Sequence, residues 1–131
     1  MTSPASSSER VVELPATAAA AGIARRELAA TPGLGGELGY KALLLASEVI
    51  AVFVDVPRPD ERLRLTISVG PERVRIAVAG HEPEASTSAL LHSHEPPSLG
   101  GYGLQIVDRM ADAWGTRRNG AAQMWFELTR A

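Results

Sequence analysis

The residues with the clearest capacity to bind a ligand are the glycines of the segment Leu99–Val107, which reads Leu-Gly-Gly-Tyr-Gly-Leu-Gln-Ile-Val. Glycine lets a backbone approach a ligand closely. A helical pattern begins at Gly103, so the free N–H groups of its first turn would point to the same place as Gly101. This spacing is typical of a phosphate-binding loop. Taken alone, however, these residues favour a simple tight turn between a loop and a helix, because short glycine motifs often occur by chance.

Potential metal ligands gather in the segment just before these glycines. Residues 80–101 have no periodic pattern, and they hold all three histidines and three prolines. Histidine and glutamate bind zinc in many proteins, and this segment contains His81, Glu82, His92, His94 and Glu95. Their spacing is irregular, which favours a solvated polar loop. We therefore assign no metal-binding residue to it.

The elements that position these residues follow from the hydrophobic periodicity. Apolar residues recur at helical spacing in three segments and alternate with polar residues in the others. In chain order we expect a strand at 11–14, helices over 17–30 and 37–54, strands at 63–69 and 74–78, a long loop, a helix from 103 to 111, and strands at 113–117 and 124–128. Hairpin-linked strands are antiparallel. The pattern therefore predicts an α+β two-layer sandwich, a mostly antiparallel sheet covered on one face by about three helices.

The composition excludes several classes of protein. The chain has 131 residues and a net charge of −2, with scattered arginines, so it lacks the basic footprint of a nucleic-acid-binding domain. It has no cysteine, which excludes disulfides and thiol catalysis. Its longest apolar stretch, residues 42–56, is interrupted by Ser47 and Glu48 and is too short to span a membrane. The first residues do not resemble a signal peptide. We expect a cytoplasmic bacterial protein with a disordered tail over 1–9 and one domain over 10–131.

The order of the segments resembles the ATP-binding domain of the histidine-kinase-like (Bergerat-fold) superfamily, in particular its anti-sigma-factor serine kinases. Leu99–Val107 resembles the second glycine box of that family, and Leu43–Ile50 resembles the helix with the Glu-x-x-x-Asn box. Asp108–Gly115 and Met124–Leu128 resemble the usual end of the domain. The resemblance runs from about residue 11 to residue 129.

The resemblance implies roles for individual residues. Gly101, Tyr102, Gly103 and Leu104 match the part of the glycine box that binds the phosphates of ATP. Glu48 matches the glutamate that these kinases use as a base toward a serine of their partner. The ordinary alternative for Glu48 is a helix residue that reaches solvent or pairs with an arginine. That alternative is favoured because a base without Mg²⁺-ATP beside it has no reaction to serve.

Two matching positions depart from the family. Val52 stands where active members have the asparagine that holds Mg²⁺, and valine has no oxygen ligand. Gly80 stands where they have the aspartate that accepts a hydrogen bond from adenine. Losing such an acceptor costs about 1.5–3 kcal/mol, or about ten- to a hundredfold in affinity. We therefore expect ATP or ADP to bind weakly or not at all, and Mg²⁺ has no clear ligand.

Three functions remain open at this point. The first is a pseudokinase-like regulator of transcription that binds a sigma factor or an anti-sigma-factor antagonist. The second is an active ATP-dependent protein serine kinase and anti-sigma factor with a divergent site. The third keeps ADP or ATP as a structural ligand without turnover. By analogy with the family, a homodimer would use the sheet.

Two further groups of residues are candidates for contact with a partner. The predicted polar face of the sheet carries Arg58, Arg62, Arg64, Arg73 and Arg75. These arginines fit simple solvation, an acidic partner or a second copy of the chain. Trp114 and Trp125 are expected to pack on the sheet or its edge, and either one, if exposed, would be a suitable anchor for a partner.

Overall fold

A computed structural model describes residues 8–80, 102–118 and 122–130. In chain order its elements are β1 (Ser8–Ala16), α1 (Ala19–Ala29), α2 (Gly36–Phe53), β2 (Arg58–Val69), β3 (Arg73–Gly80), α4 (Tyr102–Met110), β4 (Ala113–Arg118) and β5 (Ala122–Thr129). The predicted order of strands and helices is confirmed. The predicted long loop after β3 and the predicted turn between β4 and β5 lie outside the described residues.

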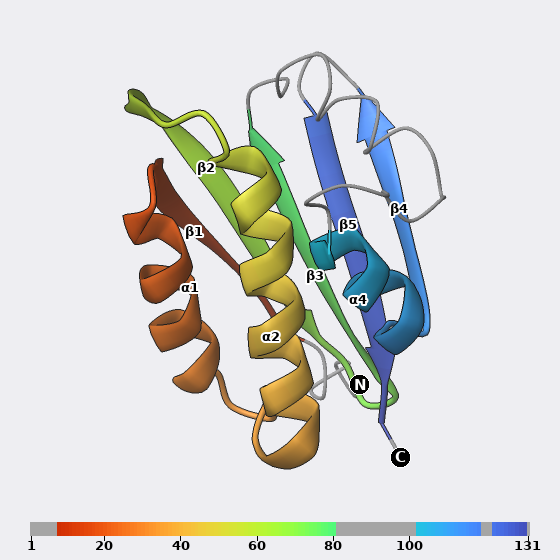
Figure 1. Cartoon of the computed structure of the whole chain (residues 1–131). Coiled ribbons are helices and arrows are strands. Elements are labelled where there is room, and N and C mark those ends of the chain that lie inside the picture. Colours follow the sequence, from red (N-terminus) through yellow and green to blue (C-terminus); the bar gives the residue numbers. More distant parts are fainter. Residues whose placement is uncertain (1–7, 81–101, 119–121, 131) are drawn as a thin grey trace.

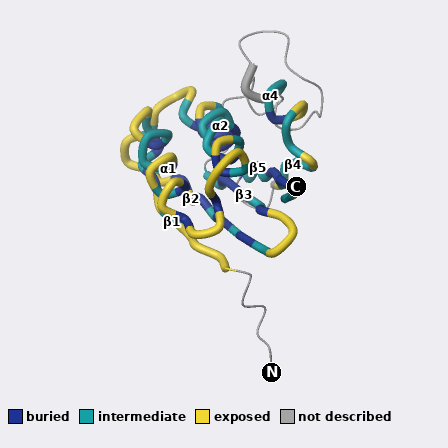
Figure 2. Tube along the Cα trace, turned by 90° about the horizontal axis from the view of Figure 1, so that it is seen from below, coloured by how far each residue is buried: buried dark blue, intermediate teal, exposed yellow. Residues whose placement is uncertain are grey.

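The strands form one sheet in the order β1-β2-β3-β5-β4, and every neighbouring pair is antiparallel. The described helices all lie on the same face of this sheet (Figure 1). Seen from below, they form one layer and the strands form the other, with buried residues between them (Figure 2). The predicted α+β two-layer architecture is therefore confirmed.

The first strand departs from its predicted bounds. It begins at Ser8, two residues before the expected start of the domain, and it continues through Pro15, where the sequence predicts its end. Proline cannot donate a backbone hydrogen bond, but an edge strand pairs on one side only and so tolerates it. The pairing with β2 shifts between Pro15 and Ala16, whose partners are Arg62 and Arg58. The proline therefore produces an irregularity near the end of an edge strand and does not end it.

The core lies between the sheet and α2. This helix contacts α1 on one flank and α4 on the other, as its nearly all-round apolar sequence predicts. Its fully buried residues include Leu45, Val49 and Ile50, and they face alternate residues of the central strands, such as Ile76 and Phe126. Each large apolar side chain buried here contributes about 1.5–3 kcal/mol. None of the described helices is long and apolar enough to cross a membrane.

The connection between α1 and α2 depends on glycine. Gly33 and Gly36 have φ angles of +84° and +64°, a region that favours glycine, so the chain turns sharply there. The turn brings the backbone carbonyl of Leu34 onto the first turn of α2. A Cβ atom at Gly39 would lie 2.1 Å from that carbonyl oxygen. Gly39 is therefore required by the close approach of backbone to helix.

We expect Gly39→Ala to destabilise the protein by about 1–3 kcal/mol, because the carbonyl of Leu34 is backbone and has little freedom to move. The matched control is Gly22→Ala in α1, where an added Cβ would meet nothing within 4 Å. Alanine should stabilise that helix by about 0.5–1 kcal/mol. Urea denaturation of both variants measures the two effects. The two changes in the free energy of unfolding need not be equal in size. An increase in stability of the Gly39→Ala variant would contradict the described packing.

Candidate nucleotide site

The two positions that depart from the family lie at the same end of the molecule. Val52 precedes the last residue of α2, and Gly80 is the last residue of β3. The two elements meet there, since a Cβ at Gly80 would lie 3.5 Å from Cδ1 of Phe53. In Figure 1 this is the upper end of the molecule. The fold therefore brings together the residues that match the magnesium and adenine positions of the family.

The space beside Gly80 is filled by an apolar side chain. A Cβ at Gly80 would lie 2.5 Å from Cδ2 of Leu63, which is 2% exposed. The β2–β3 register explains this contact, because Arg64 pairs with Ala79 and the next step along both strands brings Leu63 opposite Gly80. On its other side Gly80 pairs with Ala122 of β5, which is also buried. An aspartate at this position would require the buried side chain of Leu63 to move.

Val52 is part of the same apolar packing. It is half-buried and packs against the core cluster. It offers no oxygen, and Mg²⁺ is bound through oxygen ligands. Among the residues described by the structure, no three metal-ligating side chains gather in one place. The described residues at the Val52 and Gly80 positions therefore do not fit a complex of Mg²⁺ and adenine nucleotide.

Glu48 lies one turn before Val52 and on the same side of α2. It is half-buried, and within the described parts of the chain it makes no hydrogen bond or ion pair. The nearest residue with such contacts is Ser47, whose hydroxyl donates to the carbonyl of Leu43 at 2.9 Å and accepts from Arg25 at 3.3 Å. Ser47 is thus a helix residue whose hydroxyl is hydrogen-bonded to the preceding turn of α2 and to α1. Arg25 therefore donates a hydrogen bond to Ser47 and forms no ion pair with Glu48.

The glycine box is partly described. Gly101 lies outside the described residues, and α4 begins at Tyr102, so Tyr102, Gly103 and Leu104 form its first turn. The predicted position of the motif at a helix start is therefore confirmed. The free N–H groups of a first helical turn suit an anion. The histidines and glutamates at 81–95 that were considered as metal ligands lie outside the described residues.

The two tryptophans occupy opposite faces of the sheet. Trp114 lies on the helix-covered face, packs against the core, and donates from Nε1 to Asp108 Oδ1 at 2.9 Å. This bond ties α4 to β4. Trp125 lies on the other face, where the guanidinium of Arg75 is 4.2 Å from its ring centroid. The prediction that both pack on the sheet is confirmed.

The residue that sequence reasoning missed is Leu63. It lies 17 positions before Gly80 along the chain, and only the hairpin register places it there. A signal was present, because the turn at Gly70 fixes which residues of the two predicted strands face each other. No protein-family model matches the chain, and no curated protein matches it. The relation to the kinase family therefore remains a resemblance of motifs and of their order.

We expect Gly80→Ala to destabilise the protein by about 1–3 kcal/mol through its clash with Leu63. Leu63→Ala alone should cost about 2–5 kcal/mol, because it leaves a cavity. The double variant should cost less than the sum by about 0.5–3 kcal/mol, since the new methyl group occupies part of that cavity. Chemical denaturation of all three variants tests this coupling. Strict additivity would mean that the two residues are not in contact.

Proposed function

We propose that this protein is a regulatory binding protein with a Bergerat-like fold, related to the anti-sigma-factor serine kinases but without their nucleotide chemistry. It acts in the bacterial cytoplasm by binding a partner protein, either a sigma factor or an anti-sigma-factor antagonist. The observation that carries this proposal is the position of Leu63 against Gly80, where the family has the aspartate that recognises adenine. In such a protein the fold is retained while the residues of the nucleotide site are replaced.

A nucleotide bound at this site would lose contacts at both of its ends. At the adenine end, Gly80 stands in place of a charged acceptor and the buried side chain of Leu63 lies against it, so the amino group of the base would lose its hydrogen bond. At the phosphate end, Val52 supplies no ligand to the metal that neutralises the phosphates. The two losses act on separate parts of the ligand. Together they remove base recognition and charge neutralisation.

An active serine kinase is the second candidate function, and two observations favour it. Glu48 is half-buried without a partner among the described residues, as a general base toward a serine hydroxyl would need to be. The helix start at Tyr102 also retains N–H groups suited to phosphate oxygens. In such a kinase Glu48 would take the proton of the serine hydroxyl, and Gly101 and Gly103 would contact the phosphates.

Isothermal titration calorimetry of the full chain with ATP and with ADP, each with and without Mg²⁺, distinguishes these functions. We expect no saturable heat at millimolar nucleotide, because two losses combine: the missing adenine acceptor weakens binding by about ten- to a hundredfold, and the missing metal ligand at Val52 weakens it further. A known kinase of the anti-sigma-factor type serves as the positive control.

Micromolar binding that requires Mg²⁺ would overturn the proposal and support the kinase. In that case Glu48→Gln should abolish phosphate transfer to a serine of an antagonist protein while leaving nucleotide binding intact. Binding of ADP and ATP alike, without turnover and without need for Mg²⁺, would instead identify a structural nucleotide.

A further inference from the structure

The second face of the sheet carries an unequal distribution of charge. In the described residues no helix covers this face (Figures 1 and 2). Alternation along the paired strands places five arginines and three glutamates on it: Arg62, Arg64, Arg73, Arg75, Arg117, Glu9, Glu13 and Glu127. Five positive and three negative charges give +2, whereas all 131 residues sum to −2. The other charged residues that the structure describes, eight basic and nine acidic, sum to −1, so the open face is more basic than the rest of the described chain.

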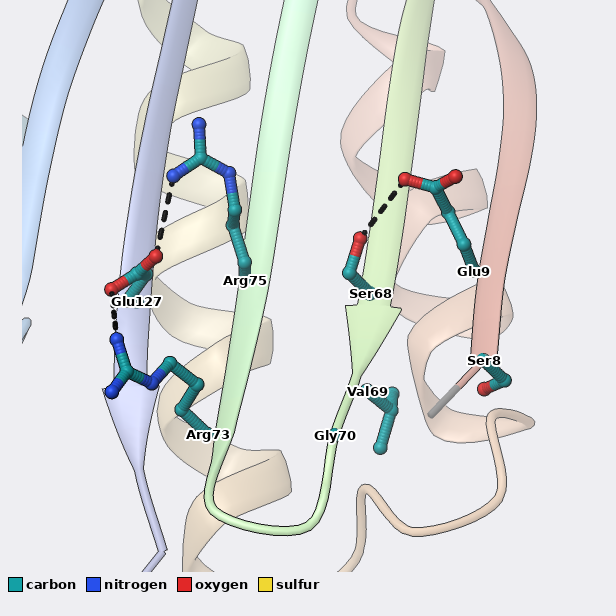
Figure 3. A pocket seen from close by; sticks show the side chains of 8 residues that line it. All are labelled: Ser8, Glu9, Ser68, Val69, Gly70, Arg73, Arg75 and Glu127. Atoms are coloured by element: carbon teal, nitrogen blue, oxygen red, sulfur yellow. Dashed lines mark hydrogen bonds and ion pairs between the residues drawn. The ribbon is translucent and has the colours of Figure 1, made fainter. Parts of the chain in front are cut away.

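A hollow lies in the open face near the β2–β3 turn. Its volume is about 430 Å³, and Arg73 and Arg75 form one wall while Glu9 and Ser68 form the other. In Figure 3 both arginine side chains reach toward Glu127, which lies beside them on β5. The Arg73 guanidinium is 3.4 Å from one oxygen of Glu127, and the Arg75 guanidinium is 3.2 Å from the other.

This arrangement leaves hydrogen-bond donors in excess on one wall. Each guanidinium has five N–H donors, and the two groups share a single carboxylate. Glu127 is 20% exposed, whereas the side chain of Arg73 is 62% exposed. Two guanidinium charges thus face one carboxylate, which leaves one positive charge uncompensated beside the exposed side chain of Arg73. Planar guanidinium groups bind a carboxylate through two parallel hydrogen bonds.

Trp125 holds this wall in place. The guanidinium of Arg75 stacks over its ring at 4.2 Å, and Arg75 also binds Glu127. The ring in turn lies over Gly115 of β4, where an added Cβ would be 2.9 Å from it. A fixed arginine loses less conformational freedom on binding than a mobile one. Tryptophan and arginine are also the residues most enriched at the energetic centres of protein interfaces.

We propose that the open sheet face binds an acidic segment of a partner protein, with one carboxylate of that segment in the hollow against Arg73 and Arg75. On the opposite wall Glu9 is negatively charged and accepts a hydrogen bond from Ser68 at 3.2 Å. It would repel an acidic segment, which we therefore place on the β3–β5 side of the hollow. A second copy of the chain is a poorer occupant, since two faces of +2 repel each other. This proposal does not depend on the fate of the nucleotide site.

The probe is a fluorescein-labelled decaglutamate peptide titrated at low salt against the full chain and followed by fluorescence anisotropy. We expect saturable binding that weakens as salt is added. Arg73→Glu should weaken it by about tenfold or more, and Arg73→Gln, the milder change, by less. The matched control is Arg26→Glu on the exposed surface of α1, which makes the same change in net charge on the other layer and should shift the affinity by less than about twofold.

A second readout locates the peptide. The chain has two tryptophans, so Trp114→Phe leaves Trp125 as the sole reporter, and unlabelled decaglutamate should change its fluorescence. Thermal melts followed by circular dichroism verify that each variant is folded. Equal losses in Arg73→Glu and Arg26→Glu, or binding without any response of Trp125, would overturn the proposal. So would a dimer in sedimentation that Arg73→Glu dissociates, because the face would then be occupied by a second copy.

Discussion

The rest of the structure depends on one apolar layer between α2 and the central strands. Only one face of the sheet is covered by described elements, so the core must be built on that side alone. α2 therefore buries three sides: against the sheet, against α1 and against α4. Small residues such as Ala42 and Ala46 let the helix approach the strands closely. On another side of the same helix, Gly39 is required by the connection from α1, where the backbone carbonyl of Leu34 occupies the space of a side chain.

This layer also explains the state of the candidate nucleotide site. A nucleotide site at the end of α2 needs polar groups next to the core, and such groups are costly to bury without their ligand. Here the layer continues through that region, with Leu63 and Phe53 against Gly80 and with Val52 on the helix. Apolar packing and ligand recognition compete for the same volume. The proposed loss of nucleotide chemistry and the continuity of the core are thus two aspects of one arrangement.

The two faces of the sheet differ in the kind of side chain that they carry. The covered face holds the fold together through apolar contact and through the bond between Trp114 and Asp108. The open face carries charged side chains, among them Arg75, which contacts both Trp125 and Glu127. Substitutions on the open face should therefore change binding with little effect on stability, and those in the apolar layer should do the reverse.

Sequence alone determined the order of the elements, the two-layer architecture and the helix start at the glycine motif, because each follows from local periodicity and from residues with special backbone preferences. It also led to the prediction that Val52 and Gly80 are unsuited to Mg²⁺ and adenine, since residue type decides which atoms are present. Element bounds were less well determined, as the strand through Pro15 illustrates, because tolerance of proline depends on whether a strand lies at an edge. Only the tertiary structure decided that Leu63 fills the space beside Gly80 and that Trp125 lies under Arg75. Both contacts join residues on different strands. The turn at Gly70 indicates which residues of β2 and β3 are opposite each other, but only the assembled sheet decides which side chain fills a given space and which strands are neighbours.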